Sequence, residues 1–348
     1  MRLSPRLSRL LHQAFTPLKV PLLEIRAARQ LAVGPPRLRV PLRDRPVPVA
    51  ERPIVRVERR GGRIVAIEAD RGWIVSRDGF STTVRRLGVF LDLLSDPRLP
   101  DGCWRAELGD SASQPGRLLA FCSNHPETTL VPDRGFFASA GYAAERRRAA
   151  AAPPFASRDA AIVWRGSPSG QGAESTPDMR ADDPSLRQRV RMCLALRHRS
   201  REGQGAVDVR LVTGRNMGAA SQSRFVASGI AGERLPQSSW CGRRFAIDVD
   251  GNANAFSNLF VRLLYGCCVI KIASPGGFRQ WYYDRLRPWE HYVPVTADCS
   301  DLEAAIDWCR GHPREAGEIA AAGRALALGM TVPSERERSV AAILAAGV

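Results

Sequence analysis

The second half of the chain alternates short apolar runs with helical patterns. Apolar runs over 160–164, 207–212, 244–249 and 268–272 have the length and the β-branched content of buried strands. Helical segments separate these runs, among them one near 183–199. Such alternation is typical of a parallel sheet covered by helices, so we expect an α/β fold.

One helix is marked by apolar residues that recur with a helical period and by a glycine suited to a left-handed cap. These residues are Phe256, Leu259, Phe260, Leu263 and Leu264, followed by Gly266. Two S-x-x-E patterns, Ser300 with Glu303 and Ser334 with Glu337, predict capping boxes where later helices begin.

The first half has a less regular α/β pattern. It predicts strands over 63–67, 73–75, 117–122 and 128–132, and a helix over 83–94. An alanine- and arginine-rich stretch follows and predicts a junction between domains. The expected divisions are a basic N-terminal segment (1–60), a first α/β domain (61–155) that ends within the junction at 143–160, a second α/β domain (156–328) and a C-terminal helix (329–348).

The N-terminal segment has its own pattern. Residues 3–18 carry a 3.6-residue apolar stripe with basic residues mostly off it, which predicts a basic amphipathic helix. Such a helix either lies in a bilayer interface or packs on its own domain, and the sequence leaves both interpretations open. Residues 34–53 hold six prolines among arginines, which favours an extended strap.

Charge follows the same division. Residues 1–60 hold thirteen arginines and Lys19 against four acidic residues, which is +10 of the formal net charge of +16. A basic arm on a mildly basic body fits an anionic lipid, an anionic glycan or a nucleic acid, and charge alone does not choose among them.

Composition excludes several classes of protein. The 348 residues contain 44% hydrophobic and 25% charged residues, which fits two globular domains and excludes wholesale disorder. No run is apolar enough to span a membrane and the N-terminus lacks a compact export signal, so we expect a cytoplasmic protein, soluble or surface-attached. Eight cysteines without paired C-x-x-C spacing predict buried thiols, with neither a zinc site nor disulfides.

Two loops carry candidate chemistry. The segment WRGSPSGQG at 164–172 leaves a predicted strand and is rich in glycine and serine, so its amides and hydroxyls suit a phosphate, although an ordinary loop fits as well. In IDVDGNAN, Asp248 and Asp250 follow another strand and suit either a divalent cation or a capped turn. No G-x-S-x-G elbow is present, which disfavours covalent hydrolysis. Asp110, in a polar turn, could serve as a single general base, although an ordinary turn aspartate fits better on these residues alone.

Longer motifs give these residues a context. They are DGN at 250–252, the helix ending at Gly266, PGGFRQWYYDRL at 275–286 and RPWEHYVPV at 287–295, with WRGSPSG at 164–170 and LPDGCWRAELGD at 99–110. Together they resemble glycosyltransferase family 90, in particular its bacterial LpsA-type lipopolysaccharide-biosynthesis branch. Rumi-type protein O-glucosyltransferases and fungal capsule xylosyltransferases are the eukaryotic relatives. The resemblance covers about 95–328.

The resemblance implies a GT-B-like architecture, in which two Rossmann-like domains face a central cleft, and inverting transfer from a UDP-sugar. It implies that Asp110 is the catalytic base and that Arg165, Gly166, Ser167 and Gly170 form the diphosphate loop. No metal is expected, because helix termini and arginines can meet the diphosphate charge. Further donor-binding positions implied by the resemblance are Asn254, Ser257, Arg262, Gln280 and His291.

Two positions depart from the eukaryotic relatives. Where those carry a phosphate-binding arginine just after a serine, this chain has Asn258 after Ser257, with Arg262 one turn later. Gln280 stands where relatives often have glutamate. The aromatic residues Trp281, Tyr282 and Trp289, with His291, either line the nucleotide site or belong to the core.

The sequence therefore predicts an inverting glycosyltransferase that moves a hexosyl or pentosyl group from a UDP-sugar to a hydroxyl of a cell-surface glycan such as lipopolysaccharide or capsule. Two other hypotheses stay open: a metal-dependent transferase that uses Asp248 and Asp250, and a non-catalytic protein that binds anionic polymers. Expected partners are the donor, a glycan or lipid-linked acceptor and an anionic membrane contacted through residues 1–30, but no nucleic acid. The expected location is the cytoplasm, at the inner face of the cytoplasmic membrane if the helix binds lipid.

Overall fold

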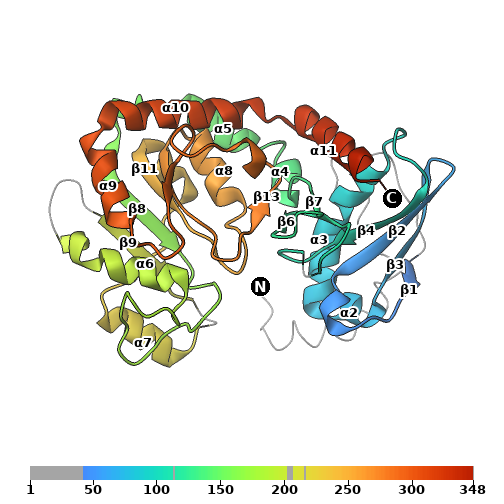
Figure 1. Ribbon diagram of the computed structural model, residues 1–348, viewed down its shortest axis with the longest axis horizontal. Helices are drawn as coiled ribbons and strands as arrows, with labels where there is room; N and C mark the ends of the chain where they lie inside the picture. Colours follow the sequence, from blue (N-terminus) through green and yellow to red (C-terminus); the bar gives the residue numbers. More distant parts are fainter. Residues whose placement is uncertain (1–41, 113, 202–206, 215–216, 348) are drawn as a thin grey trace, which may run out of the picture. The chain divides into compact units, whose positions relative to one another are not determined.

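The computed structural model describes residues 42–112, 114–201, 207–214 and 217–347, and the chain divides into two compact units (Figure 1). Unit 1 comprises the described parts of Met1–Gly141 and Thr331–Val348 together with Arg279–Trp281. Unit 2 comprises the described parts of Tyr142–Phe278 and Tyr282–Met330. The predicted amphipathic helix at 3–18 lies outside the described residues.

Unit 2 contains a six-stranded sheet in the order β10-β9-β8-β11-β12-β14, and every neighbouring pair is parallel. Counted along the chain from β8, the order is that of a doubly wound nucleotide-binding sheet. This confirms the parallel α/β sheet expected for the second half. The strands are β8 (Asp159–Gly166), β9 (Val207–Val212), β10 (Ala231–Gly232), β11 (Arg243–Asp248), β12 (Cys268–Ile272) and β14 (Val293–Val295).

Helices separate these strands, as the alternation predicted. They are α5 (Ala143–Ala150), α6 (Gln188–Leu196), α7 (Ala219–Ala227), α8 (Ser257–Leu264), α9 (Leu302–Gly311) and α10 (Pro313–Gly329). Shorter 3-10 turns are η2 (Phe155–Ser157), η3 (Arg197–Arg201), η4 (Gln237–Gly242) and η5 (Tyr283–Arg285). Gly266 ends the α8 region with φ +69°, which confirms the predicted left-handed cap.

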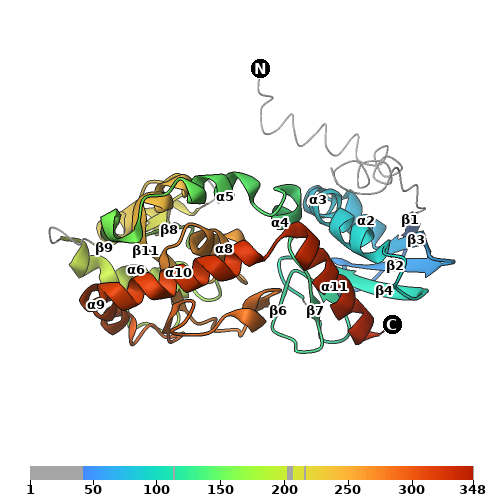
Figure 2. The same cartoon turned by 90° about the horizontal axis from the view of Figure 1, so that it is seen from above.

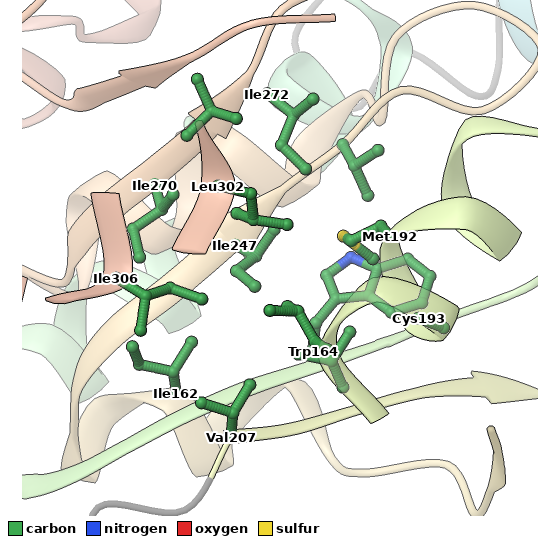
Figure 3. Packing of buried hydrophobic residues seen from close by; sticks show 14 of the residues in the cluster. Ile162, Trp164, Met192, Cys193, Val207, Ile247, Ile270, Ile272, Leu302 and Ile306 are labelled. Carbon is green, nitrogen blue, oxygen red and sulfur yellow. The ribbon is translucent and has the colours of Figure 1, made fainter. Parts of the chain in front are cut away.

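The core of unit 2 lies between the sheet and the helices α6 and α9. Ile162, Ile247 and Ile270 from three strands pack in one cluster with Met192 of α6 and Ile306 of α9 (Figure 3). Helix α10 packs along α8 and β12, and both views show it beside α8 (Figures 1 and 2). The apolar runs therefore form buried strands, as the sequence predicted.

Unit 1 has a mixed sheet in the order β1-β3-β2-β4-β5-β7. Strand β2 pairs antiparallel with β3 and with β4, whereas the other pairs are parallel. Because β2 and β3 form a hairpin, whose turn contains Gly61 and Gly62 at positive φ, this sheet differs from the Rossmann-like form expected for it. The strands are β1 (Leu42–Asp44), β2 (Ile54–Arg60), β3 (Arg63–Ala69), β4 (Gly102–Glu107), β5 (Leu119–Ala120) and β7 (Thr129–Leu130).

The rest of unit 1 covers and extends this sheet. A separate two-stranded sheet pairs β6 (Cys122–Ser123) with β13 (Arg279–Gln280). The 3-10 turn η1 (Val49–Glu51) and the helices α2 (Arg71–Val75), α3 (Arg77–Leu94), α4 (Arg134–Ala138) and α11 (Val332–Ala346) complete the unit. None of the described helices combines the length and the apolarity that crossing a membrane requires. All eight cysteines lie in the described part of the chain and none forms a disulfide, and five of them are buried.

The sequence predictions are wrong at the starts of two helices, α2 and α11. Residues 73–75 belong to helix α2 and not to a strand, because the side chain of Asp70 accepts a hydrogen bond from Trp73 N at 2.7 Å and caps the helix. Helix α11 does have a capping box, but Thr331 is its cap and Ser334 occupies the third helical position. The predicted pair Ser334 and Glu337 is therefore one turn out of register.

The other predicted capping box is also wrong. Helix α9 begins after Asp301, and Ser300 donates its hydroxyl to Asp298 at 2.9 Å within the preceding turn.

Residues 143–160, where the sequence predicted a domain junction, form α5, η2 and the start of β8 inside unit 2. The division of the first chain segment falls after Gly141.

Candidate functional site

A cavity of about 1030 Å³ lies in unit 2 at the carboxyl ends of its strands. Its walls are the loop after β8 (165–169), the loop after β9 (212–214), the segment 234–237 and two side chains of α8, Asn258 and Arg262. Strands β8 and β11 are neighbours whose connections run in opposite directions, so the cavity occupies the switch point of the sheet. In open parallel sheets this is where ligands bind.

The loop after β8 is shaped by close backbone contacts. A Cβ on Gly166 would lie 2.5 Å from the ring of Trp164, so only glycine fits there without a shift. Gly170 has φ +139° and donates its amide to Asn252 Oδ1 at 3.0 Å, which ties this loop to the loop after β11. Ser167 borders the cavity beside Ser169. The structure thus brings Gly166 and Ser167 to the cavity wall and fixes Gly170 next to it.

Arg165 also borders the cavity, but its guanidinium is held elsewhere. Its Nη2 donates to the carboxylate of Asp208 at 2.5 Å, and its Nη1 donates to the carbonyl of the same residue at 2.7 Å. Another bond joins its Nε to the carbonyl of Glu233. Arg165 therefore fastens the end of β8 to β9 and β10 and is not free to meet a phosphate in this arrangement.

Arg189 of α6 is a structural anchor of the site that sequence reasoning missed. It is 9% exposed and donates to the carbonyls of Ser167, Val249 and Asp250 and to Ser169 Oγ. Burial lowers the pKa of its guanidinium. One arginine thus joins the loops after β8 and β11. Its sequence position within an ordinary helical pattern carries no signal of this role.

Arg262 presents a different environment. Its residue is 6% exposed, and its guanidinium carbon lies 3.7 Å from the centre of the Trp240 ring. Among the described residues its one hydrogen bond goes to the carbonyl of Gln237 at 3.5 Å, and no described carboxylate forms an ion pair with it. Burial lowers its pKa to about 10, so it stays a cation at neutral pH. The cavity wall therefore contains a buried cation that forms no ion pair within the described part of the chain, although Asp248 acts on it electrostatically.

The two candidate metal ligands are engaged by other groups. Asp248 is fully buried and pairs with Lys271 Nζ at 3.2 Å and with the amide of Asn258 at 2.9 Å. Asp250 accepts two bonds of 3.2 Å from the amide of Asn254. Burial raises the pKa of Asp250, and Lys271 opposes that rise. Within the described part of the chain, no group of three or more His, Cys, Asp or Glu side chains could hold a metal ion.

Four of the predicted donor-binding residues lie away from the cavity wall. Asn254 is 4% exposed, and its amide is used by Asp250 and by the carbonyl of Phe278. Ser257 opens α8 but does not border the cavity, whereas its neighbour Asn258 does. The side-chain amide of Asn254 therefore holds the loop after β11 in place and is not presented to a ligand.

Gln280 and His291 are structural in their surroundings. Gln280 is 2% exposed and pairs with Cys122 in the β6–β13 sheet of unit 1. The Nδ1 atom of His291 accepts a bond from the amide of Arg287 at 3.0 Å, and burial lowers the pKa of this histidine. Trp281 and Tyr282 are buried, which is the core interpretation, while Trp289 is exposed.

A smaller cavity of about 350 Å³ in unit 2 also borders Asn252. Its walls include Gly170, Asp250, Ser274 and Asp298, which lie at the ends of β11, β12 and β14 or in the loop after β8. Both cavities thus lie at the carboxyl edge of the same sheet, near the switch point between β8 and β11.

Asp110 belongs to unit 1, in the turn that follows β4. Its side chain is 56% exposed, and its Oδ1 accepts a hydrogen bond from Arg86 Nη2 at 2.5 Å. An exposed carboxylate can accept a proton from a hydroxyl that comes within hydrogen-bond distance.

Comparison with known proteins identifies the family. Glycosyl transferase family 90 matches residues 142–330, the span of unit 2, and does not reach the stretch that contains Asp110. Protein 027R of Frog virus 3, which is uncharacterized, is 30% identical over 186 residues, or 51% of this chain and 19% of the viral protein. Protein O-glucosyltransferase 2 of Danio rerio is 36% identical over 84 residues, or 24% of this chain and 16% of the fish protein.

The uncharacterized protein 035R of Invertebrate iridescent virus 3 is 39% identical over 77 residues, 22% of this chain and 7% of the viral protein. The aligned part of this chain therefore spans less than a fifth of each of these relatives. The family match covers more than half of the 348 residues and coincides with the unit that carries the cavity at the switch point. The chain belongs to glycosyltransferase family 90.

Proposed function

We propose that the protein transfers a hexosyl or pentosyl group from a UDP-sugar to a hydroxyl of a cell-surface glycan, with inversion at the anomeric carbon. The observation that carries this proposal is Arg262, a buried cation without a described partner anion, which borders the cavity at the switch point of a nucleotide-binding type of sheet. A diphosphate supplies the missing negative charge. Ser167, Ser169 and Asn258 add hydrogen-bonding side chains on the same wall.

Uridine as the base is what the resemblance implies, and glucose-like sugars as the transferred group are supported by relatives named protein O-glucosyltransferase. Arg262 lies one turn after the position where eukaryotic relatives have their phosphate-binding arginine. We infer that it replaces that arginine from a different position on the same helix. Asn258, at the earlier position, holds Asp248.

The chemical step assigned to unit 1 is a single proton transfer. Asp110 removes the proton from the acceptor hydroxyl as its oxygen forms a bond to the anomeric carbon of the donor. The bond from that carbon to the diphosphate breaks on the opposite face, and UDP leaves with the electron pair. In this proposal, a GT-B-like arrangement brings donor and base together.

No metal is required in this mechanism, because Arg262 and backbone amides meet the diphosphate charge. The competing hypothesis of a metal held by Asp248 and Asp250 is disfavoured, since Lys271 already neutralises Asp248. Turnover in the presence of EDTA distinguishes the two. Unchanged turnover supports the metal-free mechanism, and loss that Mg²⁺ or Mn²⁺ restores supports the other.

Acceptor and location rest on the basic arm, residues 1–30. We propose that this arm holds the enzyme at the anionic inner face of the cytoplasmic membrane, near a lipid-linked acceptor of lipopolysaccharide or capsule synthesis. Deleting residues 1–30 should abolish binding to vesicles that contain anionic lipid. Unchanged vesicle binding by the deleted chain would contradict the proposal.

The donor is tested by a thermal-shift panel of UDP, UDP-sugars, and ADP- and GDP-sugars. A ligand present at 100 times its Kd stabilises the folded state by about 2.7 kcal/mol, which is a shift of several degrees. We expect UDP and one or more UDP-sugars to raise Tm, and ADP- and GDP-sugars to leave it unchanged. If no uridine compound raises Tm while a salt-sensitive polyanion does, the third hypothesis, a non-catalytic binder of anionic polymers, is favoured.

A further inference from the structure

The turn that contains Asp110 is held by hydrogen bonds from one arginine of α3, Arg86. Arg86 Nη1 donates to the carbonyl of Leu108 at 2.9 Å and also to the carbonyl of Gly109. Its Nη2 donates to Asp110 Oδ1 at 2.5 Å. Three successive residues are thus fixed by one planar group, whose fork geometry sets direction as well as distance.

Arg86 binds only one of the two carboxylate oxygens of Asp110. Oδ1 of Asp110 is engaged by Arg86, whereas Oδ2 accepts no hydrogen bond from any described residue. The Asp110 side chain is 56% exposed and that of Arg86 is 24% exposed, so the cation lies deeper than the carboxylate. The free oxygen is therefore the one that an incoming hydroxyl can reach.

Two other carboxylates near this pair, Glu107 and Asp133, have separate roles. Glu107 is buried and accepts the amide of Gly109 at 2.8 Å, from the end of β4. Asp133 caps α4 by accepting the amides of Gly135 and Phe136, and Arg86 is the cation that acts on it electrostatically. Neither of these side chains is the exposed acid of this turn.

We propose that Arg86 is the positioning residue for the general base: it fixes the carboxylate of Asp110 through Oδ1 and leaves Oδ2 to take the acceptor proton. This inference rests on the proposed role of Asp110. In the reaction the O–H bond of the acceptor breaks and an O–H bond forms at Oδ2. Arg86 gains and loses no proton, and the carboxylic acid later releases its proton to water.

The test uses the full chain and the donor that the thermal-shift panel selects, with hydrolysis by water as the measured transfer. In Arg86→Gln we expect kcat to fall about 10-fold to 100-fold, with the Kd for UDP within twofold of wild type. Arg86→Lys keeps a charged hydrogen-bond donor but loses the planar fork, so it should restore only part of kcat.

Failure of the inference and failure of the proposed function give different results. If Asp110→Asn keeps wild-type kcat, the base assignment itself is wrong. If Asp110→Asn is inactive but folded Arg86→Gln keeps the wild-type kcat, Arg86 has no positioning role. Should Arg86→Gln fail to fold by circular dichroism, Arg86→Lys decides. A kcat at least threefold lower with wild-type UDP affinity supports the inference, and wild-type kcat overturns it.

Discussion

Replacing Arg262 by methionine separates binding of the donor from stability of the fold. Methionine keeps an unbranched apolar stem of similar length, so packing against Trp240 is largely retained. The guanidinium is lost, and with it the buried cation that borders the cavity. Because that cation has one described hydrogen bond, of 3.5 Å, its removal leaves no strong partner unsatisfied.

The expected loss of affinity follows from the interaction removed. A hydrogen bond between a guanidinium and a phosphate oxygen contributes about 1.5 to 3 kcal/mol, since one partner or both are charged. That range corresponds to an increase of about 10-fold to 100-fold in the Kd for UDP. The free energy of unfolding without ligand should stay within about 1 kcal/mol of wild type, because a buried cation that forms no ion pair with any described residue contributes little to stability.

Isothermal titration with UDP measures the first quantity, and urea denaturation of the ligand-free protein measures the second. Arg314→Met is the matched control, since Arg314 is exposed on α10 and pairs with Glu318 at 2.5 Å, outside the cavity. The control should bind UDP as wild type does. Wild-type UDP affinity in Arg262→Met would refute the assignment of the diphosphate to this cavity.

Three further predictions test the surroundings of the site. Lys271→Met leaves the fully buried carboxylate of Asp248 without its cation and should lower the free energy of unfolding, measured by urea denaturation, by about 3 to 5 kcal/mol. Adding Asp248→Asn should restore part of this stability, and a Lys271→Met variant as stable as wild type would contradict the prediction. Gly166→Ala places a Cβ 2.5 Å from the Trp164 ring and should weaken UDP binding by shifting the loop after β8, whereas wild-type affinity would show that the loop does not contact the donor. Burial lowers the pKa of His291, so the unfolded chain binds its proton more tightly; Tm should fall as pH drops from 7.5 to 5.5, and by less in His291→Gln, while equal slopes would exclude this histidine as a source.

The sheet of unit 2 could be predicted because its signals are local. Runs such as 160–164 and 268–272 are short, apolar and β-branched, and the structure has β8 and β12 over them. Residues 73–75 have the same composition, yet they form part of a helix because Asp70 caps it. Apolar runs of three residues do not distinguish strand from helix, and one capping side chain decides between them.

The site could be predicted in part, for a physical reason. Ser167 and Arg262 border the cavity as expected, since residues after strands and on the following helix gather at the switch point. Gln280 is in the β6–β13 sheet, a pairing with a segment more than 150 residues earlier that no local pattern announces. Arg189 was missed because its bonds to three carbonyls depend on tertiary proximity alone.

Arg165 shows where motif and role separate. The W-R-G-S pattern suggests an arginine aimed at phosphate, but the guanidinium is bound by Asp208, which the sequence carries 43 residues later on β9. Within unit 2, Arg262 on a helix is therefore better placed to meet the negative charge of a ligand than Arg165, which lies in the loop that carries the motif.

The central claim is that unit 2 binds a UDP-sugar while Asp110 of unit 1 activates the acceptor. Parallel assays of Asp110→Asn test it most directly: UDP binding by titration, and UDP release from the donor selected in the thermal-shift panel. We predict wild-type UDP affinity with a rate of release lowered about 10²-fold to 10⁴-fold, the usual contribution of a general base. Asparagine at this position with a wild-type rate of UDP release would contradict the account.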